Sequence, residues 1–201
     1  MSFTEHSSVQ IPLGKLALTD LKKGDIDAIV DFWYGGSADH EFLGVDKLKL
    51  GHPDDTRLRF EKAIRTGEKS QETIAFAIRL NDKMIGYTLL NRYTPEINYS
   101  HWHIMTTSLR GSGISTTMYP YRLKMYFDLF PISRLIHQTR TRNIAVNRML
   151  DKYIPIAETG YVTSPDGVAL PGDFHTRYVL AGDIPGFFKT LALMKENKTD
   201  K

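Results

Sequence analysis

Two histidines separated by one residue, with a glutamate shortly before them, are the side chains whose types and spacing suit acid–base chemistry. His101 and His103 flank Trp102 in a run of strand-forming residues, and Glu96 precedes that run. Residues two apart on a strand point to the same face of a sheet, so both imidazoles would face one side. Histidine titrates near neutral pH, so we expect His101, His103 or Glu96 to accept a proton from a nucleophile, directly or through water.

The same His-Trp-His pattern has two other interpretations, which the sequence leaves open. The histidines could form a hydrogen-bonded pair in the protein interior, or they could be two ligands of a zinc ion. Zinc requires a third protein ligand, which Glu96 or His137 would have to supply through the fold. His137 is expected to face the core or a neighbouring helix, so we predict no metal site.

A glycine-containing turn that follows these residues could bind an anion. The turn, Arg110–Ser115, reads Arg-Gly-Ser-Gly-Ile-Ser and stands between a predicted strand and a predicted helix. The first amides of a helix have no partner within the helix, and glycines let a phosphate approach the backbone. The alternative is an ordinary strand-to-helix turn. A Walker loop would require Gly-Lys-Ser/Thr after a four-residue gap, and a dinucleotide-binding turn would require glycine or alanine where Thr116 stands. Binding of ATP or NAD is therefore disfavoured.

The elements that must position these residues are those of a mixed α/β domain. Hydrophobic alternation predicts strands near 15–21, 73–80, 84–90, 97–107, 134–141, 156–162 and 174–180. Helical spacing predicts helices after Asp25, from Asp54 or Asp55 to Gly67, and near 116–129, 143–153 and 187–194. Residues 37–53 are expected to be a loop, and Pro165-Asp166-Gly167 a turn. Pro120 has no amide to donate to Thr116, so we expect a kink or a loose first turn in its helix.

Composition limits the class of protein. The 201 residues are 41% apolar and 24% charged, which suits a single globular domain. The absence of cysteine excludes disulfides, thiolate zinc sites and a cysteine nucleophile. No apolar run reaches the roughly 18 residues of a membrane span, and residues 1–10 contain no apolar signal core, so a cytoplasmic protein is expected. The net charge of +3 does not by itself indicate a nucleic-acid binder. The residues closest to a basic cluster are Arg134, Arg140, Arg142 and Arg148.

Arg110, Gly113 and the order of the predicted elements resemble the GNAT superfamily of N-acetyltransferases, in particular the branch of ribosomal-protein and antibiotic N-acetyltransferases. The turn of that family reads Gln/Arg-x-x-Gly-x-Gly/Ala, and Ser115 stands here in the last position. A strand, an asparagine and a helix then follow in the family, as Asn143 and its neighbours do here. The resemblance extends over about residues 15 to 180. It implies a single-domain α/β fold with a mixed, mostly antiparallel sheet flanked by helices.

The resemblance also implies acetyl-CoA as co-substrate and no metal. Backbone amides of the glycine turn would hold the pyrophosphate, backbone at residues 104–106 would pair with the pantetheine arm, and Asn143 would hydrogen-bond that arm. The residues so assigned to CoA binding are Ile104, Met105, Thr106, Arg110, Gly111, Ser112, Gly113, Ile114, Ser115 and Asn143.

At two positions where the family has a residue that can transfer a proton, this sequence has a residue that cannot. Gln138 stands where the family often has a glutamate base, and Leu150 where it has a tyrosine acid. The helix also ends in Tyr153-Ile154-Pro155 instead of Gly-Phe. We therefore predict acetyl transfer from acetyl-CoA to a primary amine by direct attack on the thioester, with His101, His103 and Glu96 as the catalytic candidates. The alternative is a CoA-binding GNAT-fold module without turnover.

The acceptor site is expected in the loop before residue 50. Acidic and aromatic residues there could line a pocket for a cationic amine, or the loop could simply be solvated; they are Trp33, Tyr34, Asp39, His40, Glu41 and Asp46. Arg140 and Arg142 could contact the CoA 3′-phosphate or solvate the end of a strand. Nucleic-acid binding through the arginines is a third hypothesis, supported by charge alone.

The expected organisation is a flexible N-terminal arm at 1–14, an acyl-CoA N-acyltransferase domain at 15–182, and a C-terminal helix and tail at 183–201. Phe187 and Phe188 are expected to pack this helix on the domain or on a second subunit, so a homodimer is one option. The expected partners are acetyl-CoA and an amine-bearing small molecule or peptide, with no nucleic acid and no membrane.

Overall fold

Alternating apolar residues and tight hairpin turns build an eight-stranded sheet in the computed structural model, which describes residues 4–36, 38–66 and 72–199. In spatial order the strands are β1-β2-β3-β4-β5-β6-β8-β7. Their bounds are β1 Glu5–Ile11, β2 Gly14–Asp20, β3 Thr73–Leu80, β4 Lys83–Asn91, β5 Tyr99–Ile104, β6 Leu135–Arg140, β7 Glu158–Val162 and β8 Gly172–Val179. All neighbouring strands are antiparallel except β5 and β6, which run parallel.

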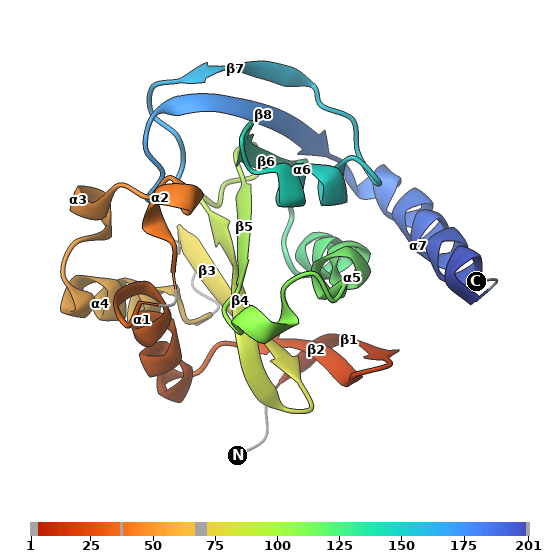
Figure 1. The fold of residues 1–201 in the computed structure, drawn as a ribbon, viewed down its shortest axis with the longest axis horizontal. Coiled ribbons are helices and arrows are strands. Elements are labelled where there is room, and N and C mark those ends of the chain that lie inside the picture. The colour runs from red at the N-terminus through yellow and green to blue at the C-terminus, as the bar shows by residue number, and fades with distance from the viewer. Residues whose placement is uncertain (1–3, 37, 67–71, 200–201) are drawn as a thin grey trace.

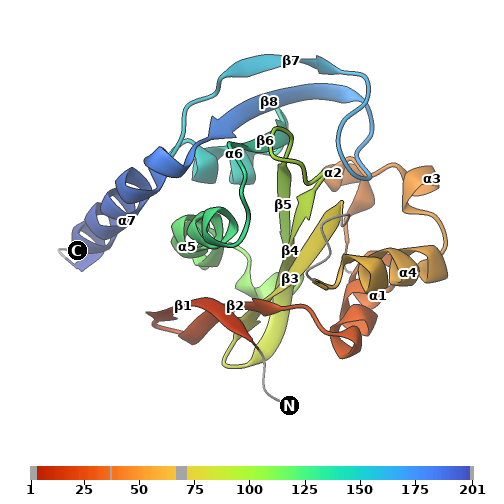
Figure 2. The same cartoon turned by 180° about the vertical axis from the view of Figure 1, so that it is seen from behind.

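Helices cover both faces of this sheet. Their bounds are α1 Ile26–Tyr34, α2 His40–Leu43, α3 Lys47–Leu50, α4 Pro53–Ala63, α5 Ile114–Leu129, α6 Ile144–Leu150 and α7 Ile184–Thr199. Figures 1 and 2 show α1 to α4 on one side of the sheet and α5, α6 and α7 on the other. The predicted fold class, a mixed and mostly antiparallel sheet flanked by helices, is confirmed.

The two layers of helices bury two separate cores because β3 is apolar on both faces. Phe76 and Ile78 pack with the residues of α5 and α7, whereas Ala75 and Ala77 pack with α1 and α4. Phe187 lies in the first core, so α7 packs on the domain, as expected.

The parallel pair β5 and β6 touches at one end and then separates. Tyr99 pairs with Ile136, and the amide of Ile136 donates to the carbonyl of Asn98 at 2.8 Å. One residue further along, His137 Nδ1 reaches the carbonyl of Ser100 at 3.2 Å across the gap. The sheet is therefore split toward the carboxyl ends of these two strands.

Helix α5 runs through Pro120 without ending there. Proline cannot donate to the carbonyl of Thr116, and the hydroxyl of Tyr153 donates to that carbonyl instead, at 2.8 Å. A tertiary contact thus satisfies the acceptor that the proline leaves without its helical partner.

Two expectations about the N-terminal third of the chain are wrong. Within the predicted arm at 1–14, residues 5–11 are not loose, because they form β1, which pairs with β2, and Val9 and Ile11 pack against the core; residues 1–3 lie outside the described residues. The segment 37–53 is not simply a loop, because it contains the short helices α2 and α3. Helix α4 ends at Ala63; Gly67, the predicted end, lies outside the described residues.

Candidate active site at the split sheet

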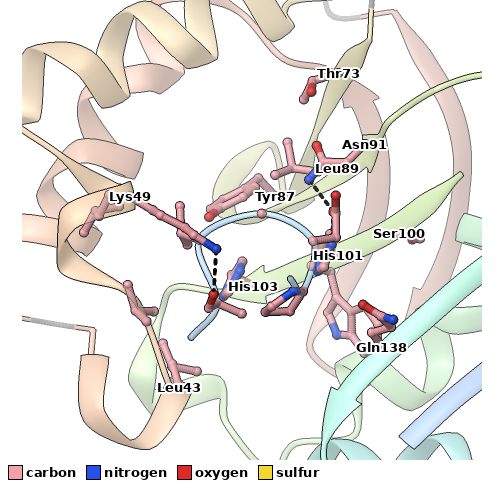
Figure 3. A pocket seen from close by; sticks show the side chains of 18 of the residues that line it. Leu43, Lys49, Thr73, Tyr87, Leu89, Asn91, Ser100, His101, His103 and Gln138 are labelled. Carbon is pink, nitrogen blue, oxygen red and sulfur yellow. Dashed lines mark hydrogen bonds and ion pairs between the residues drawn. The ribbon is translucent and has the colours of Figure 1, made fainter. Parts of the chain in front are cut away.

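A cavity of about 550 Å³ opens where β5 and β6 separate. Its walls come from α1, α3, α4, strands β4 to β6, and the loop 163–171 between β7 and β8. Figure 3 shows His101, His103, Tyr87 and Gln138 around its interior. The structure thus brings together both predicted histidines in one cavity.

His101 is paired with a carboxylate that sequence reasoning does not predict at this site. Its Nε2 lies 2.7 Å from Oδ2 of Asp166, which comes from the loop between β7 and β8. A carboxylate at Nε2 favours the tautomer with the proton on that nitrogen, which leaves the lone pair on Nδ1. This arrangement resembles the base and orienting carboxylate of catalytic triads, with the roles of the two ring nitrogens exchanged.

Asp166 is held in place and kept ionised by three partners. Asn91 Nδ2 donates to Oδ2 at 3.0 Å, and Arg92 Nε lies 3.0 Å from Oδ1. Burial acts to raise the pKa of Asp166, but the hydrogen bonds from His101 and Asn91 and the charge of Arg92 outweigh it, so the pKa lies below its ordinary value. Gly167, at φ +68°, completes the turn that presents this carboxylate.

His103 lies in a different environment although it faces the same side of β5. Its ring centroid is 5.1 Å from that of Trp33 and 5.1 Å from that of Tyr87. Burial, with the nearby charges of His101 and Arg110, lowers the pKa of His103 to about 3. His103 is therefore neutral at physiological pH and suits the wall of the cavity better than the role of base.

Glu96, the third catalytic candidate, is not brought to the cavity. It is exposed in the turn that precedes β5, and its amide is 3.3 Å from the hydroxyl of Thr94. This turn lies before the start of β5, whereas the split opens toward the carboxyl end of that strand.

The two family positions that depart from the pattern have contrasting locations. Gln138 lines the cavity, and its Oε1 is buried with no hydrogen-bond partner among the described residues. Leu150 is fully buried in the core next to α5. Tyr153, three residues later, commits its hydroxyl proton to Thr116.

The glycine turn has the geometry of an anion site. Gly111 and Gly113 have φ of +80° and +85°, where glycine is favoured, and a Cβ at either position would meet no atom within 4 Å. Gly113 is the N-cap residue immediately before α5, and none of the described side chains caps the first amides of that helix. Unpaired amides and the positive end of the helix dipole favour a phosphate at this place.

The other residues assigned to CoA are only in part free to bind it. The amides of Met105 and Thr106 both face the carbonyl of Ile85, at 2.8 and 3.3 Å, so these donors are already used within the sheet. Asn143 lines the cavity and caps α6 through its Oδ1. Within the described part of the chain, its Nδ2 has no partner and remains available to a ligand.

Buried polar atoms gather beside the split on the α5 side. Arg122 of α5 is 3% exposed, and its guanidinium carbon lies 3.9 Å from the ring centre of Trp102. Burial lowers its pKa to about 10, so it stays charged at neutral pH. The guanidinium nitrogens and His137 Nε2 have no hydrogen-bond partner among the described residues. Such atoms are costly to bury, and neither Arg122 nor His137 lines the cavity.

The predicted acidic acceptor pocket is only partly formed. Trp33 lines the cavity, but Asp39, Glu41 and Asp46 do not. Asp46 instead caps α3 by accepting from the amides of Leu48 and Lys49. The acidic residues of this segment therefore do not contribute negative charge to the cavity wall.

The parts of the chain that the structure describes contain no helix long and apolar enough to span a membrane. They also contain no group of three or more His, Asp or Glu side chains arranged to hold a metal ion.

Comparison with known proteins identifies one matching family model and many solved structures with a similar fold. The sequence model described as an acetyltransferase (GNAT) domain matches residues 15–153. A search of curated proteins finds no match. In solved structures, 208 chains match.

The structural neighbours share the fold at low sequence identity. RimJ of Mycobacterium smegmatis in complex with CoA-disulfide is 16% identical, with a TM-score of 0.69, and the match covers 90% of this chain and 92% of that one. Spermidine N-acetyltransferase from Vibrio cholerae, in complex with CoA and spermine, is 13% identical, with a TM-score of 0.66 and coverage of 84% and 97%. The Microcin C7 self-immunity acetyltransferase MccE, in complex with acetyl-CoA and AMP, is also 13% identical, with a TM-score of 0.64 and coverage of 85% and 97%.

Proposed function

This chain belongs to the acetyltransferase (GNAT) family, and on that premise we propose that it transfers an acetyl group from acetyl-CoA to a primary amine bound in the cavity. The observation that carries the proposal is the pairing of His101 with Asp166 at the place where the sheet splits. A base oriented by an ionised carboxylate is what the attack of an amine on a thioester requires.

The residues present fit acetyl-CoA. The open glycine turn at the start of α5 would receive the pyrophosphate through the first amides of the helix. Nδ2 of Asn143 and Oε1 of Gln138, both from residues that line the cavity, would receive the pantetheine arm. When bound, acetyl-CoA supplies the activated carbonyl carbon, and the protein supplies position and proton transfer.

His101 is the proposed base. An amine arrives mostly protonated at neutral pH and must lose a proton before its lone pair can attack. His101 accepts that proton at Nδ1, directly or through water, while Asp166 holds Nε2–H and stabilises the positive charge that forms on the ring. His103 stays neutral and, with Trp33 and Tyr87, forms an apolar wall beside the reacting groups.

The proton and electron balance closes without another acid. The new bond joins the amine nitrogen to the acetyl carbon, and the bond to sulfur breaks with its electron pair. A thiol of ordinary pKa, about 8.5, leaves readily as thiolate. After the attack the nitrogen loses a second proton as the tetrahedral intermediate collapses. One of the two protons reaches the thiolate through His101 and the other is released to solvent, which gives the amide, CoA and one free proton. Gln138 and Leu150 are therefore compatible with turnover although neither transfers a proton.

The test is CoA thiol release in the presence of acetyl-CoA and a panel of primary amines, for the unaltered protein, His101→Gln and His103→Gln. We expect His101→Gln to lower kcat by about 100-fold or more, because general-base catalysis contributes 10²–10⁴-fold. His103→Gln should lower it far less.

Calorimetric titration with acetyl-CoA is the matched control, because neither substitution touches the glycine turn. Acetyl-CoA binding without thiol release for any amine would contradict the proposal and leave the CoA-binding module. Equal kcat for His101→Gln and the unaltered protein would remove His101 from the base role.

A further inference from the structure

The cavity has an excess of positive charge, which differs from the acidic pocket that the sequence led us to expect. Four cationic side chains and two carboxylates line it, and His103 is neutral. The cations are Lys49, Arg59, Arg92 and Arg140, and the carboxylates are Glu72 and Asp166. An amine acceptor that carried only positive charge would be repelled by this surface.

Three of the four cations keep their charge uncompensated by a carboxylate. Lys49 Nζ donates to the carbonyl of Ala169 at 3.3 Å, and Arg59 Nη2 to the carbonyl of Lys49 at 3.0 Å. Arg140 Nη2 donates to the carbonyl of Leu170 at 2.7 Å. Of the four, only Arg92 forms an ion pair within the described residues, and its partner is Asp166. Carbonyl partners orient these side chains without neutralising them.

Lys49 and Arg59 lie on the side of the sheet that the acceptor would use. They come from α3 and α4, whereas the glycine turn for the CoA pyrophosphate begins α5, on the opposite side of the sheet (Figures 1 and 2). Figure 3 shows Lys49 reaching from its helix into the cavity. Both residues are exposed, so they stand at the mouth, while His101 and Tyr87 lie further in. The charge of Lys49 and Arg59 is thus placed for the acceptor molecule and not for CoA.

From this arrangement we propose that the acceptor is an amine whose own molecule carries anionic groups within a few bonds of the nitrogen. The amine enters toward His101, and its carboxylates or phosphate remain at the mouth beside Lys49 and Arg59. The inference rests on the proposed function and adds the charge class of the acceptor.

The experiment compares kcat/KM for three peptides of equal length with a free N-terminus: Ser-Glu-Glu-amide, Ser-Gln-Gln-amide and Ser-Lys-Lys-amide. Ethanolamine and phosphoethanolamine form a second pair that separates phosphate from carboxylate as the source of the charge. We expect the acidic member of either series to exceed its neutral counterpart by about fivefold or more, and the advantage to shrink as salt is added.

Variants locate the effect in the cavity. Arg59→Gln and Lys49→Gln should each lower the ratio of kcat/KM for the acidic acceptor to kcat/KM for its neutral counterpart about two- to fivefold. The controls are Arg57→Gln and Lys47→Gln on the same two helices, whose side chains do not line the cavity. Neither control should change the ratio of kcat/KM for the acidic acceptor to kcat/KM for the neutral one.

The outcomes separate this inference from the proposed function. Transfer to neutral or cationic amines with no preference for acidic ones would overturn the inference and keep the acetyltransferase. No thiol release with any amine would contradict the proposed function itself. Equal losses in the cavity variants and in the controls would also overturn the inference, because the effect would then be one of overall charge.

Discussion

The two histidines of β5 differ in their ability to act as a base, although their positions in the sequence predict the same role for both. His101 and His103 face the same side of the strand, but only His101 meets a carboxylate. Burial among Trp33 and Tyr87 keeps His103 neutral. Spacing predicts a shared face, and the partners that distinguish the two rings come from distant segments.

Asp166 acts on the reaction through His101, and its substitution tests that role. We expect Asp166→Asn to lower kcat at least tenfold, because an amide at Nε2 no longer favours one tautomer or stabilises the charged ring. KM for acetyl-CoA should be unchanged, since Asp166 does not border the glycine turn. The measurement is a pH profile of kcat for both proteins.

A merely structural role for Asp166 predicts a different result. Loss of the hydrogen bond from Asn91 and the ion pair with Arg92 would lower the melting temperature and leave the shape of the pH profile unaltered. Recovery of activity in Asp166→Glu would support the need for a carboxylate.

The sequence predicted half of this dyad for a physical reason. The two-residue spacing of His101 and His103 is a local property of a strand and is visible in the sequence. Asp166 looked like an ordinary turn residue, because its contact with His101 spans 65 positions and depends on how β7 and β8 return to the sheet. Glu96 is close to His101 in sequence, but it precedes β5 and therefore lies at the end of that strand opposite the split.

The start of α5 is the element on which CoA binding depends in this account. Gly113 lies at φ +85°, and its surroundings are open, so a side chain there would point into the space proposed for the phosphates. The affinity for CoA should therefore depend on the backbone conformation, the side-chain volume and the charge at position 113.

Gly113→Glu should abolish measurable acetyl-CoA binding by calorimetry, because it adds a side chain and a negative charge beside the pyrophosphate. Gly113→Gln shares the volume and the strained φ but lacks the charge, so we expect it to bind more weakly than the unaltered protein and more tightly than Gly113→Glu. Unchanged affinity in Gly113→Glu would show that CoA binds elsewhere.

The contact between Tyr153 and the helix interrupted by Pro120 gives a second test at this scale. Tyr153→Phe should lower the free energy of unfolding by about 1 kcal/mol, because the carbonyl of Thr116 loses its donor. In a Pro120→Ala background the loss should be smaller, since the new amide of residue 120 donates to the same carbonyl. Urea unfolding of the four proteins measures the coupling. Equal losses in both backgrounds would contradict this account of the helix.

The elements that the sequence predicted well are those with strong local patterns. The bounds of β3 agree with the prediction, and β4 differs only at its ends, because alternating apolar residues flank a short hairpin turn. Strand β1 was missed because its sequence EHSSVQI is mostly polar, as an edge strand of one sheet allows. The helices α2 and α3 are only four residues each, too short to show a helical period.

The whole molecule should lose stability as the solution becomes acidic. Burial holds the pKa of His103 at about 3, below that of an unfolded histidine, and keeps the pKa of His137 well below 6.5 as well. Protons then bind the unfolded chain first, so stability is complete above about pH 6.5 and falls as the pH drops toward the folded value. Each such histidine contributes a slope of about 1.4 kcal/mol per pH unit.

Replacing one of these histidines should reduce that slope. His103→Phe retains a ring beside Trp33 and Tyr87. Between pH 6 and pH 4 its free energy of unfolding should fall less steeply than that of the unaltered protein, with a slope lower by up to about 1.4 kcal/mol per pH unit, which corresponds to one proton. Urea denaturation at several pH values measures it. A slope equal to that of the unaltered protein would contradict the neutral state assigned to His103.

The central claim is that this molecule joins the acetyl group of acetyl-CoA to an amine in the cavity, with His101 as the base. The most direct measurement uses acetyl-CoA labelled in the acetyl group, a mixture of amines and peptides, and mass spectrometry of the products. The account expects a labelled N-acetyl product with the unaltered protein and a strongly reduced yield with His101→Gln at equal acetyl-CoA occupancy. An absence of labelled product despite bound acetyl-CoA, or the same yield from both proteins, would contradict it.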